Sequence, residues 1–159
     1  MRKFYGMLVA TLFASATLGA CMADSGSGSN SGDETTTATL IKSNQELEVY
    51  LRSAADSPLD RLAPDAKQRF LSGLRFSESG LGSFQKTELE ALSATEVSHI
   101  LGLFGVERTA SMITKASVTS ESDKAVMQAA PFLPDHDGYE CTGRGTCHRE
   151  FSSICTSNC

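Results

Sequence analysis

The cysteines are the residues of this chain whose type and spacing point most directly to chemistry. Cys21 stands alone near the start, while four others share a short C-terminal segment with the spacing C-x5-C-x7-C-x3-C, namely Cys141, Cys147, Cys155 and Cys159. A cysteine sulfur can form a thioether, join a disulfide or bind a metal as a thiolate. Because five cysteines cannot all pair with one another, we expect the isolated Cys21 to have a different partner.

The residues before Cys21 indicate an export signal. Arg2 and Lys3 precede a predominantly apolar run over residues 4–18, which is the layout of a secretory signal peptide. At about 15 residues, this run is shorter than the roughly 20 that cross a bilayer as a helix. We therefore predict that residues 1–20 are a signal segment that is removed.

The sequence Leu18-Gly19-Ala20-Cys21 resembles the lipobox of bacterial lipoproteins. The resemblance implies that Cys21 receives a diacylglyceryl group through a thioether, that cleavage occurs before it, and that its freed amino group is acylated. Several acyl chains anchor a protein firmly, since each buried methylene contributes about 0.8 kcal/mol. Residue 22 is Met and not the Asp of the inner-membrane retention signal, so we expect the outer membrane, on its periplasmic or surface face.

An earlier cleavage motif leaves an alternative open. Cleavage after Ala14-Ser15-Ala16 would leave Cys21 in a soluble, secreted protein. Either route exports the chain, and export makes disulfide formation available to the C-terminal cysteines.

The mature chain divides into three predicted parts. Residues 21–39 contain the lipidated cysteine and a linker rich in Ser, Gly and Thr, which lacks the large apolar residues needed to fold and behaves as a disordered tether. Residues 40–133 are predicted to be a helical domain. Residues 134–159 are predicted to be a cysteine-rich C-terminal module.

Apolar residues at helical spacing predict an all-α fold, a small bundle of about five helices. The pairs Ser43 with Glu46 and Ser93 with Glu96 form capping-box patterns that begin helices. A second helix follows Pro64, and further helices are expected around residues 85–92, 107–116 and 121–130. Between them, Gly80 and Gly82 interrupt any helix, and Leu81 and Phe84 are expected to fold back onto the core.

The C-terminal module is too small to fold by burying apolar surface alone. Two disulfides among its four cysteines would stabilise it by about 2 to 3 kcal/mol each in the chain-entropy model. Three pairings are compatible with the sequence. Our working hypothesis is the crossed one, Cys141 with Cys155 and Cys147 with Cys159. Zinc bound by these cysteines, with His148 as an additional ligand, is the alternative.

Residues that could support catalysis do not form a recognised motif. His99, His136 and His148 lie in no nucleophile, metalloprotease or phosphate-loop signature, and we expect His99 on the polar face of its helix. Residues 135–140 contain acidic residues spaced as in half a calcium loop, with a solvated hinge as the other interpretation. We predict no catalytic residues, no metal site, no cofactor and no enzymatic activity.

The charge of the chain argues against binding to nucleic acid. The full chain carries a net charge of -5, and removal of Arg2 and Lys3 with the signal segment leaves 12 basic and 19 acidic residues, or -7. An acidic surface repels phosphate backbones.

Residues 69–105, RFLSGLRFSESGLGSFQKTELEALSATEVSHILGLFG, resemble the bacteriocin fulvocin C-related protein family. The matching features are the Phe70-Leu71 pair, the segment leading into Gly80-Leu81, the spaced leucines and the closing residues 100–105. The resemblance covers core and turn positions, so it implies a fold more than an activity. The family name refers to a small cysteine-rich antimicrobial peptide.

Two functions follow from these features. In the first, the membrane-anchored chain is a non-enzymatic surface interaction module whose stapled tip contacts an unidentified protein or a component of the cell envelope. In the second, it is a bacteriocin-like precursor whose cysteine-rich tail is released by cleavage in residues 131–138 as an antimicrobial effector.

Overall fold

A computed structural model describes residues 40–113, 115–130 and 134–159. The predicted signal segment 1–20, the lipidation site Cys21 and the tether up to residue 39 lie outside the described residues. All of the described residues belong to one compact unit. Within the described ranges, no helix has the length and apolar character needed to cross a membrane.

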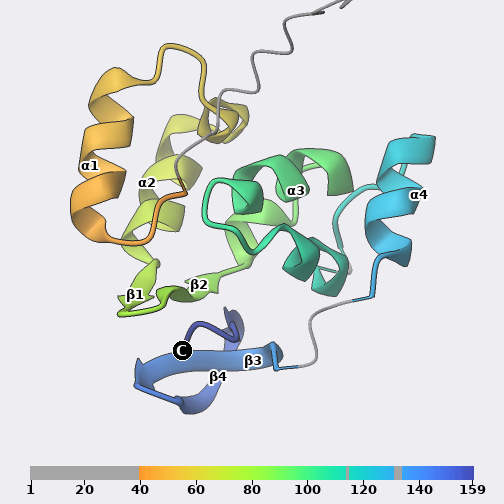
Figure 1. The fold of residues 1–159 in the computed structure, drawn as a ribbon. Coiled ribbons are helices and arrows are strands. Elements are labelled where there is room, and N and C mark those ends of the chain that lie inside the picture. Colours follow the sequence, from red (N-terminus) through yellow and green to blue (C-terminus); the bar gives the residue numbers. More distant parts are fainter. Residues whose placement is uncertain (1–39, 114, 131–133) are drawn as a thin grey trace, which may run out of the picture. The chain divides into compact units, whose positions relative to one another are not determined.

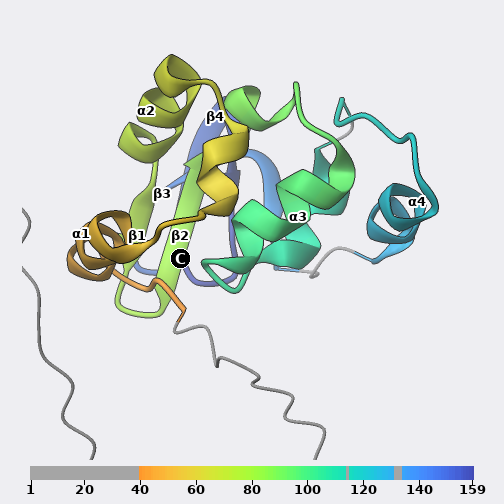
Figure 2. The same cartoon turned by 90° about the horizontal axis from the view of Figure 1, so that it is seen from above.

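The described residues form a mixed α/β fold, so the prediction of an all-α helical bundle is wrong. Four strands make one antiparallel sheet in the order β1-β2-β4-β3, and the helices lie on one side of it (Figures 1 and 2). The strands are β1 (Arg75–Ser77), β2 (Gly80–Gln85), β3 (His136–Gly143) and β4 (Thr146–Cys155).

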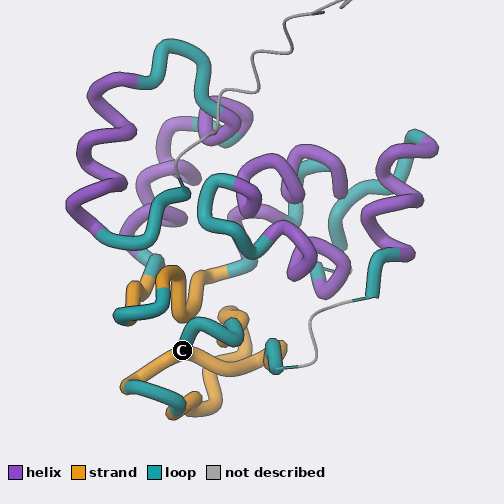
Figure 3. The backbone as a smooth tube through the Cα atoms, viewed as in Figure 1, coloured by secondary structure: helices purple, strands orange, loops and turns teal. Residues whose placement is uncertain are grey.

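The helical layer is made of short elements joined by loops (Figure 3). The α-helices are α1 (Asn44–Ser53), α2 (Pro64–Ser72), α3 (Ala94–Gly102) and α4 (Glu121–Gln128). Short stretches of 3-10 helix lie between them: η1 (Pro58–Arg61), η2 (Thr87–Leu89) and η3 (Glu107–Met112).

Sequence analysis does not predict the strand β2 because its residues do not alternate between apolar and polar. It lies between β1 and β4, and all of its residues from Gly80 to Phe84 are buried. A strand buried on both faces has no polar side to alternate with an apolar one. The predicted interruption of the helices here is confirmed: Gly80 turns the chain from β1 into β2 with a φ of 129°, a conformation that favours glycine.

The capping pattern at Ser93 correctly predicts the start of α3. The Ser93 hydroxyl accepts a hydrogen bond from the Glu96 N–H (3.3 Å), and the Glu96 carboxylate accepts one from the Ser93 N–H (3.0 Å). At α1 only one of the two capping-box hydrogen bonds forms: the Ser43 hydroxyl accepts from the Glu46 N–H. The Glu46 carboxylate accepts a hydrogen bond from the N–H of Lys42 and not from that of Ser43.

Three predicted helices are shorter than expected or of another type. The expected helix over residues 85–92 contains only η2, because Gln85 belongs to the sheet and pairs with Ser153 of β4. The expected helix over residues 107–116 is the 3-10 helix η3, and that over residues 121–130 is α4.

The core lies between the helices and the sheet, and the C-terminal segment contributes to it. Phe70 of α2 meets Phe84 of β2 and Phe104 after α3 in edge-to-face contacts at 6.3 and 6.5 Å between ring centroids. Leu81 and Phe84 are buried, as predicted. Ile154 of β4 is also completely buried in this core. The C-terminal strands are thus part of the same hydrophobic core as the helices.

Candidate functional site

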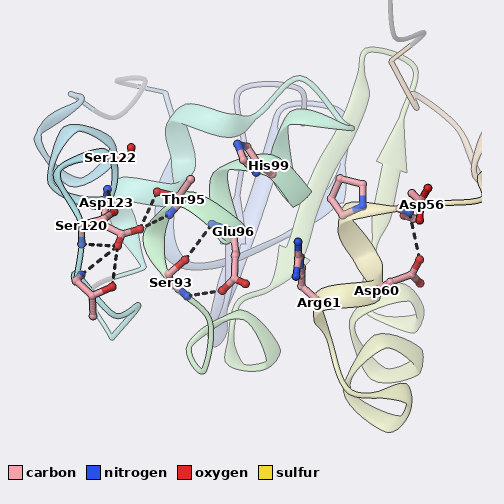
Figure 4. Close-up of a pocket in the computed structure, with 13 residues that line it drawn as sticks. Asp56, Asp60, Arg61, Ser93, Thr95, Glu96, His99, Ser120, Ser122 and Asp123 are labelled. Carbon is pink, nitrogen blue, oxygen red and sulfur yellow. Dashed lines mark hydrogen bonds between the residues drawn. The ribbon is translucent and has the colours of Figure 1, made fainter.

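A polar groove between η1, α3 and α4 contains several titratable side chains (Figure 4). His99 lines it and is exposed, which confirms its predicted place on the polar face of α3. The neighbouring carboxylates already accept hydrogen bonds from backbone N–H groups: Glu96 from Ser93, and Asp60 from Ser57. They cap helix starts, a structural task that takes up oxygens a general base would need.

Asp123 is the most constrained carboxylate of this groove. Its side chain is buried and accepts five hydrogen bonds of 2.7 to 3.2 Å, from the N–H and hydroxyl of both Thr95 and Thr119 and from the N–H of Ser120. The bonds from Thr95 and Thr119 hold the pKa of the Asp123 carboxyl far below its ordinary value. Asp123 therefore joins the start of α4 to the start of α3. The pattern Ser120-x-x-Asp123 is the sequence signal that could have revealed it.

A second groove lies between α1 and α3 and is mainly apolar. Leu40, Val49 and Leu103 are among its lining residues. Leu40 and Val49 keep 40% and 52% of their surface exposed. Glu46, His99 and Glu107 also line this groove, and its mainly apolar character makes it chiefly a contact surface.

The acidic residues Asp135, just before β3, and Asp137 and Glu140, within it, do not converge on a common point. Asp135 accepts hydrogen bonds from the Thr109 hydroxyl (2.8 Å) and the Ser157 N–H (2.7 Å). Asp137 pairs with Lys86, and Glu140 pairs with Arg75 at 3.1 Å. Each carboxylate fastens the strand at a different place. This part of the chain is thus neither a calcium loop nor a solvated hinge.

The four C-terminal cysteines form two disulfides, as predicted. The bridges are Cys141–Cys159 and Cys147–Cys155, with Cα–Cα distances of 5.6 and 6.2 Å. The crossed pairing that we favoured from the sequence is therefore wrong, and one bridge encloses the other along the chain. Because these sulfurs are bonded to each other, zinc binding through thiolates would first require their reduction.

The turn after β4 explains the observed pairing. The Thr156 N–H donates to the Gly82 carbonyl (2.8 Å), and the chain then reverses so that the Cys159 carbonyl accepts from the Gly145 N–H (2.7 Å). This reversal returns Cys159 to the β3–β4 turn, near Cys141. Spacing alone could not show it, since the turn depends on the contact with β2.

The Cys141–Cys159 bridge lies directly against β2. The Cys141 N–H donates to the hydroxyl of the buried Ser83 (3.0 Å). A Cβ atom at Gly82 would lie only 3.1 Å from the Cys141 sulfur. Gly82 thus leaves the space in which the bridge approaches the sheet, a close contact that a larger residue would obstruct.

An exposed aromatic side chain projects from the stapled hairpin. The β3–β4 register pairs Tyr139 with Arg149 and Asp137 with Ile154, so residues 150–153 form a bulge in β4. Phe151 lies in this bulge with 75% of its surface exposed, and the Arg149 guanidinium stands 5.6 Å from its ring centroid. Sequence analysis did not single out Phe151. The sequence feature that could have revealed it is the position of Phe151 as the one aromatic side chain among the polar residues 149–153.

Comparison with known proteins gives no match. No model of a protein family matches the chain, and neither a curated protein nor a solved structure matches it significantly. The function is therefore argued from the chain's own residues. The resemblance of residues 69–105 to the bacteriocin fulvocin C-related family stays a prediction.

We expect Asp123→Asn to destabilise the fold more than Glu121→Gln, an exposed carboxylate in the same helical turn. The lowered pKa of Asp123 means that its stabilising contribution is complete above the ordinary pKa near 3.8 and is lost as the pH falls toward the folded-state pKa. Thermal unfolding should show a large gap between wild type and Asp123→Asn at pH 7. The gap should narrow steadily below about pH 4.

A gap that stays constant from pH 7 to pH 2 would contradict this role of the ionised carboxylate. The Glu121→Gln variant controls for the loss of a negative charge near the start of α4.

Proposed function

We propose that this protein is a lipid-anchored, extracytoplasmic and non-enzymatic surface interaction module of a bacterium. Cys21 carries the lipid, residues 21–39 serve as the tether, and the outer membrane is the destination. The contact element is the disulfide-stapled β3–β4 hairpin with Phe151 at its bulge. The partner is a protein or another component of the cell envelope.

The observation that carries this proposal is the exposure of Phe151 on a fixed support. A phenylalanine with 75% of its surface in water is a ready source of binding energy, because burying it against a partner releases the hydrating water. The Cys147–Cys155 bridge spans the bulge and the Cys141–Cys159 bridge fixes the turn of the hairpin, and both reduce the conformational freedom that binding would otherwise remove. Arg149 beside the ring adds a second side chain that is common in binding hot spots.

The use of polar side chains in the helical layer supports a non-enzymatic role. Asp123, Glu96 and Asp60 accept hydrogen bonds that fix helix starts, and these bonds account for the orientation of their carboxylates. The apolar groove between α1 and α3 adds contact surface on the same unit.

The alternative is a bacteriocin-like precursor that releases its tail, as the fulvocin C resemblance would suggest. One observation favours it: both disulfides lie within residues 141–159, so a cut in residues 131–138 would yield a stapled fragment with no covalent link to the helical layer. Two others oppose release. Residues 153–155 pair with β2, and Ile154 is completely buried, so separation would open the core.

Lipidation is tested by the mass of the protein extracted from its natural host. We expect loss of residues 1–20 and the added mass of several acyl chains, with the protein in the membrane fraction. Cys21→Ser should lack the added mass and leave that fraction. A native protein with the mass of an unacylated chain would contradict the anchor.

Binding through the hairpin is tested by Phe151→Ala in the full chain. We expect its affinity for isolated cell envelopes of the host to fall about tenfold or more, while its unfolding temperature stays close to that of wild type. Val118→Ala, an exposed apolar position (45% exposed) outside both the hairpin and the apolar groove, is the control and should bind as wild type. Equal loss in both variants, or no loss in Phe151→Ala, would refute the hairpin as the contact element.

Display and release are distinguished by a site-specific protease sequence inserted after Ala130. After cleavage, we expect the C-terminal fragment to co-elute with the helical part in native buffer, because β4 remains paired with β2, and to separate in denaturant without reductant. Ile154→Ala should weaken this retention, since it removes the buried contact. A cleaved wild-type fragment that elutes alone in native buffer would favour the effector.

A further inference from the structure

One of the two disulfides lies in a cleft. The cleft has a volume of about 370 Å³ and separates the β1–β2 hairpin from the turn that joins β3 to β4. Cys141 and Cys159 line one wall, and Phe76 and Ser77 line the other. Both cysteines of this bridge are partly exposed, so a small molecule in the cleft can touch their sulfurs.

The second disulfide lies behind the first. The sulfurs of Cys141, Cys155 and Cys159 all lie within 4.8 Å of one another. Cys155 is completely buried, and its bridge partner Cys147 is partly exposed but lies outside the cleft lining. The two bridges thus form a sulfur cluster with one bridge, Cys141–Cys159, that lines the cleft and a second bridge, Cys147–Cys155, that lies outside it and is buried at Cys155.

We propose that Cys141–Cys159 is a thiol-exchange site for low-molecular-weight thiols of about tripeptide size. A thiolate enters the cleft and opens this bridge, and the neighbouring Cys147–Cys155 bridge then takes part in the exchange. The inference goes beyond the proposed surface role and does not depend on it.

The first step forms one sulfur–sulfur bond and breaks another. Disulfide exchange proceeds by attack of a thiolate on one sulfur, opposite to the sulfur that leaves. The Cys141 sulfur packs against the buried strand β2 at Gly82, while the Cys159 sulfur lies 3.2 and 3.4 Å from the carbonyl oxygens of Gly143 and Thr146, which belong to the exposed β3–β4 turn. Because the exposed turn yields more readily than the buried strand, the incoming thiolate attacks Cys159, forms a mixed disulfide with it, and expels Cys141 as a thiolate. No net oxidation or reduction occurs.

Two further steps complete a relay. The Cys141 thiolate attacks the Cys155 sulfur, which lies within 4.8 Å, and expels Cys147 as a thiolate. Cys147 then attacks the mixed disulfide at Cys159 and releases the small thiolate. The products are the bridges Cys141–Cys155 and Cys147–Cys159, and the small thiol is regenerated. The four cysteines can thus exchange from the observed pairing to the crossed pairing.

The charge around the cleft favours an anionic thiol. Arg144 lines the cleft and stands 3.6 Å from Glu78, but both side chains are almost fully exposed, so the pair is weak and the arginine stays available to another anion. Arg75, the other cleft arginine, is held by Glu140. Arg144 is therefore the side chain that draws an anionic thiol toward the bridge.

The test exposes the native full chain to reduced glutathione at pH 8, followed by acid quenching and mapping of bridges and adducts by mass spectrometry. We expect the first adduct on Cys159, with Cys147–Cys155 still closed, and later the crossed pairing. A first adduct on Cys147 or Cys155, or no exchange before global unfolding, would overturn the proposal.

Paired variants separate the two bridges. Cys147→Ser with Cys155→Ser keeps the cleft bridge and should open within about threefold of the wild-type rate. Cys141→Ser with Cys159→Ser keeps only the bridge outside the cleft, which is buried at Cys155, and should open at least tenfold more slowly. Equal rates would overturn the proposal, and the wild-type adduct map decides if either variant fails to fold.

The anion preference has its own control. Arg144→Gln should slow exchange with glutathione about two- to threefold and leave exchange with neutral 2-mercaptoethanol nearly unchanged, with the difference shrinking at high salt. Arg52→Gln, an exposed arginine on α1 outside the cleft lining, should match wild type with both thiols. An equal effect of both variants would refute steering by Arg144.

Discussion

The antiparallel pairing of β2 with β4 is the interaction on which the rest of the structure depends. It matches Ser83 with Cys155 and Phe84 with Ile154, and the Thr156 N–H extends it to the Gly82 carbonyl. Through this pairing Ile154 enters the core that the helices build around Phe70. The same pairing supports the disulfides, because it fixes the turn that returns Cys159 to the hairpin.

The two ends of the stapled hairpin have different tasks. At the bulge, residues 150–153 do not pair with β3, and Phe151 is presented to solvent. At the turn, the Cys141–Cys159 bridge borders a cleft against β1. Both features need a rigid hairpin, and a segment of this length gains its rigidity from the two disulfides and from packing against β2. Gly82 is essential to that packing, because a larger residue there would obstruct the Cys141–Cys159 bridge.

Sequence patterns predict the local features of this fold well and its long-range contacts poorly. The start of α3 follows from Ser93 and Glu96, and the burial of Leu81 and Phe84 follows from the glycines beside them. The sheet does not follow, because β2 is buried on both faces and β1 has only three residues. The disulfides follow from the cysteine count, but their pairing depends on the turn after β4. The exposure of Phe151 depends on a bulge that only the register reveals.

The distance along the chain between β2 and its partner has a consequence for biosynthesis. Residues 153–155 are made about 70 residues after β2, so the sheet cannot close while the nascent chain is still short of them. Until then, the edge of β2 opposite β1 has no strand beside it, and neither bridge has both of its sulfurs. A product that stops at residue 154 lacks Cys155, Thr156 and Cys159 together. Only a chain synthesised through these positions can therefore complete the sheet, form both disulfides and bury its core.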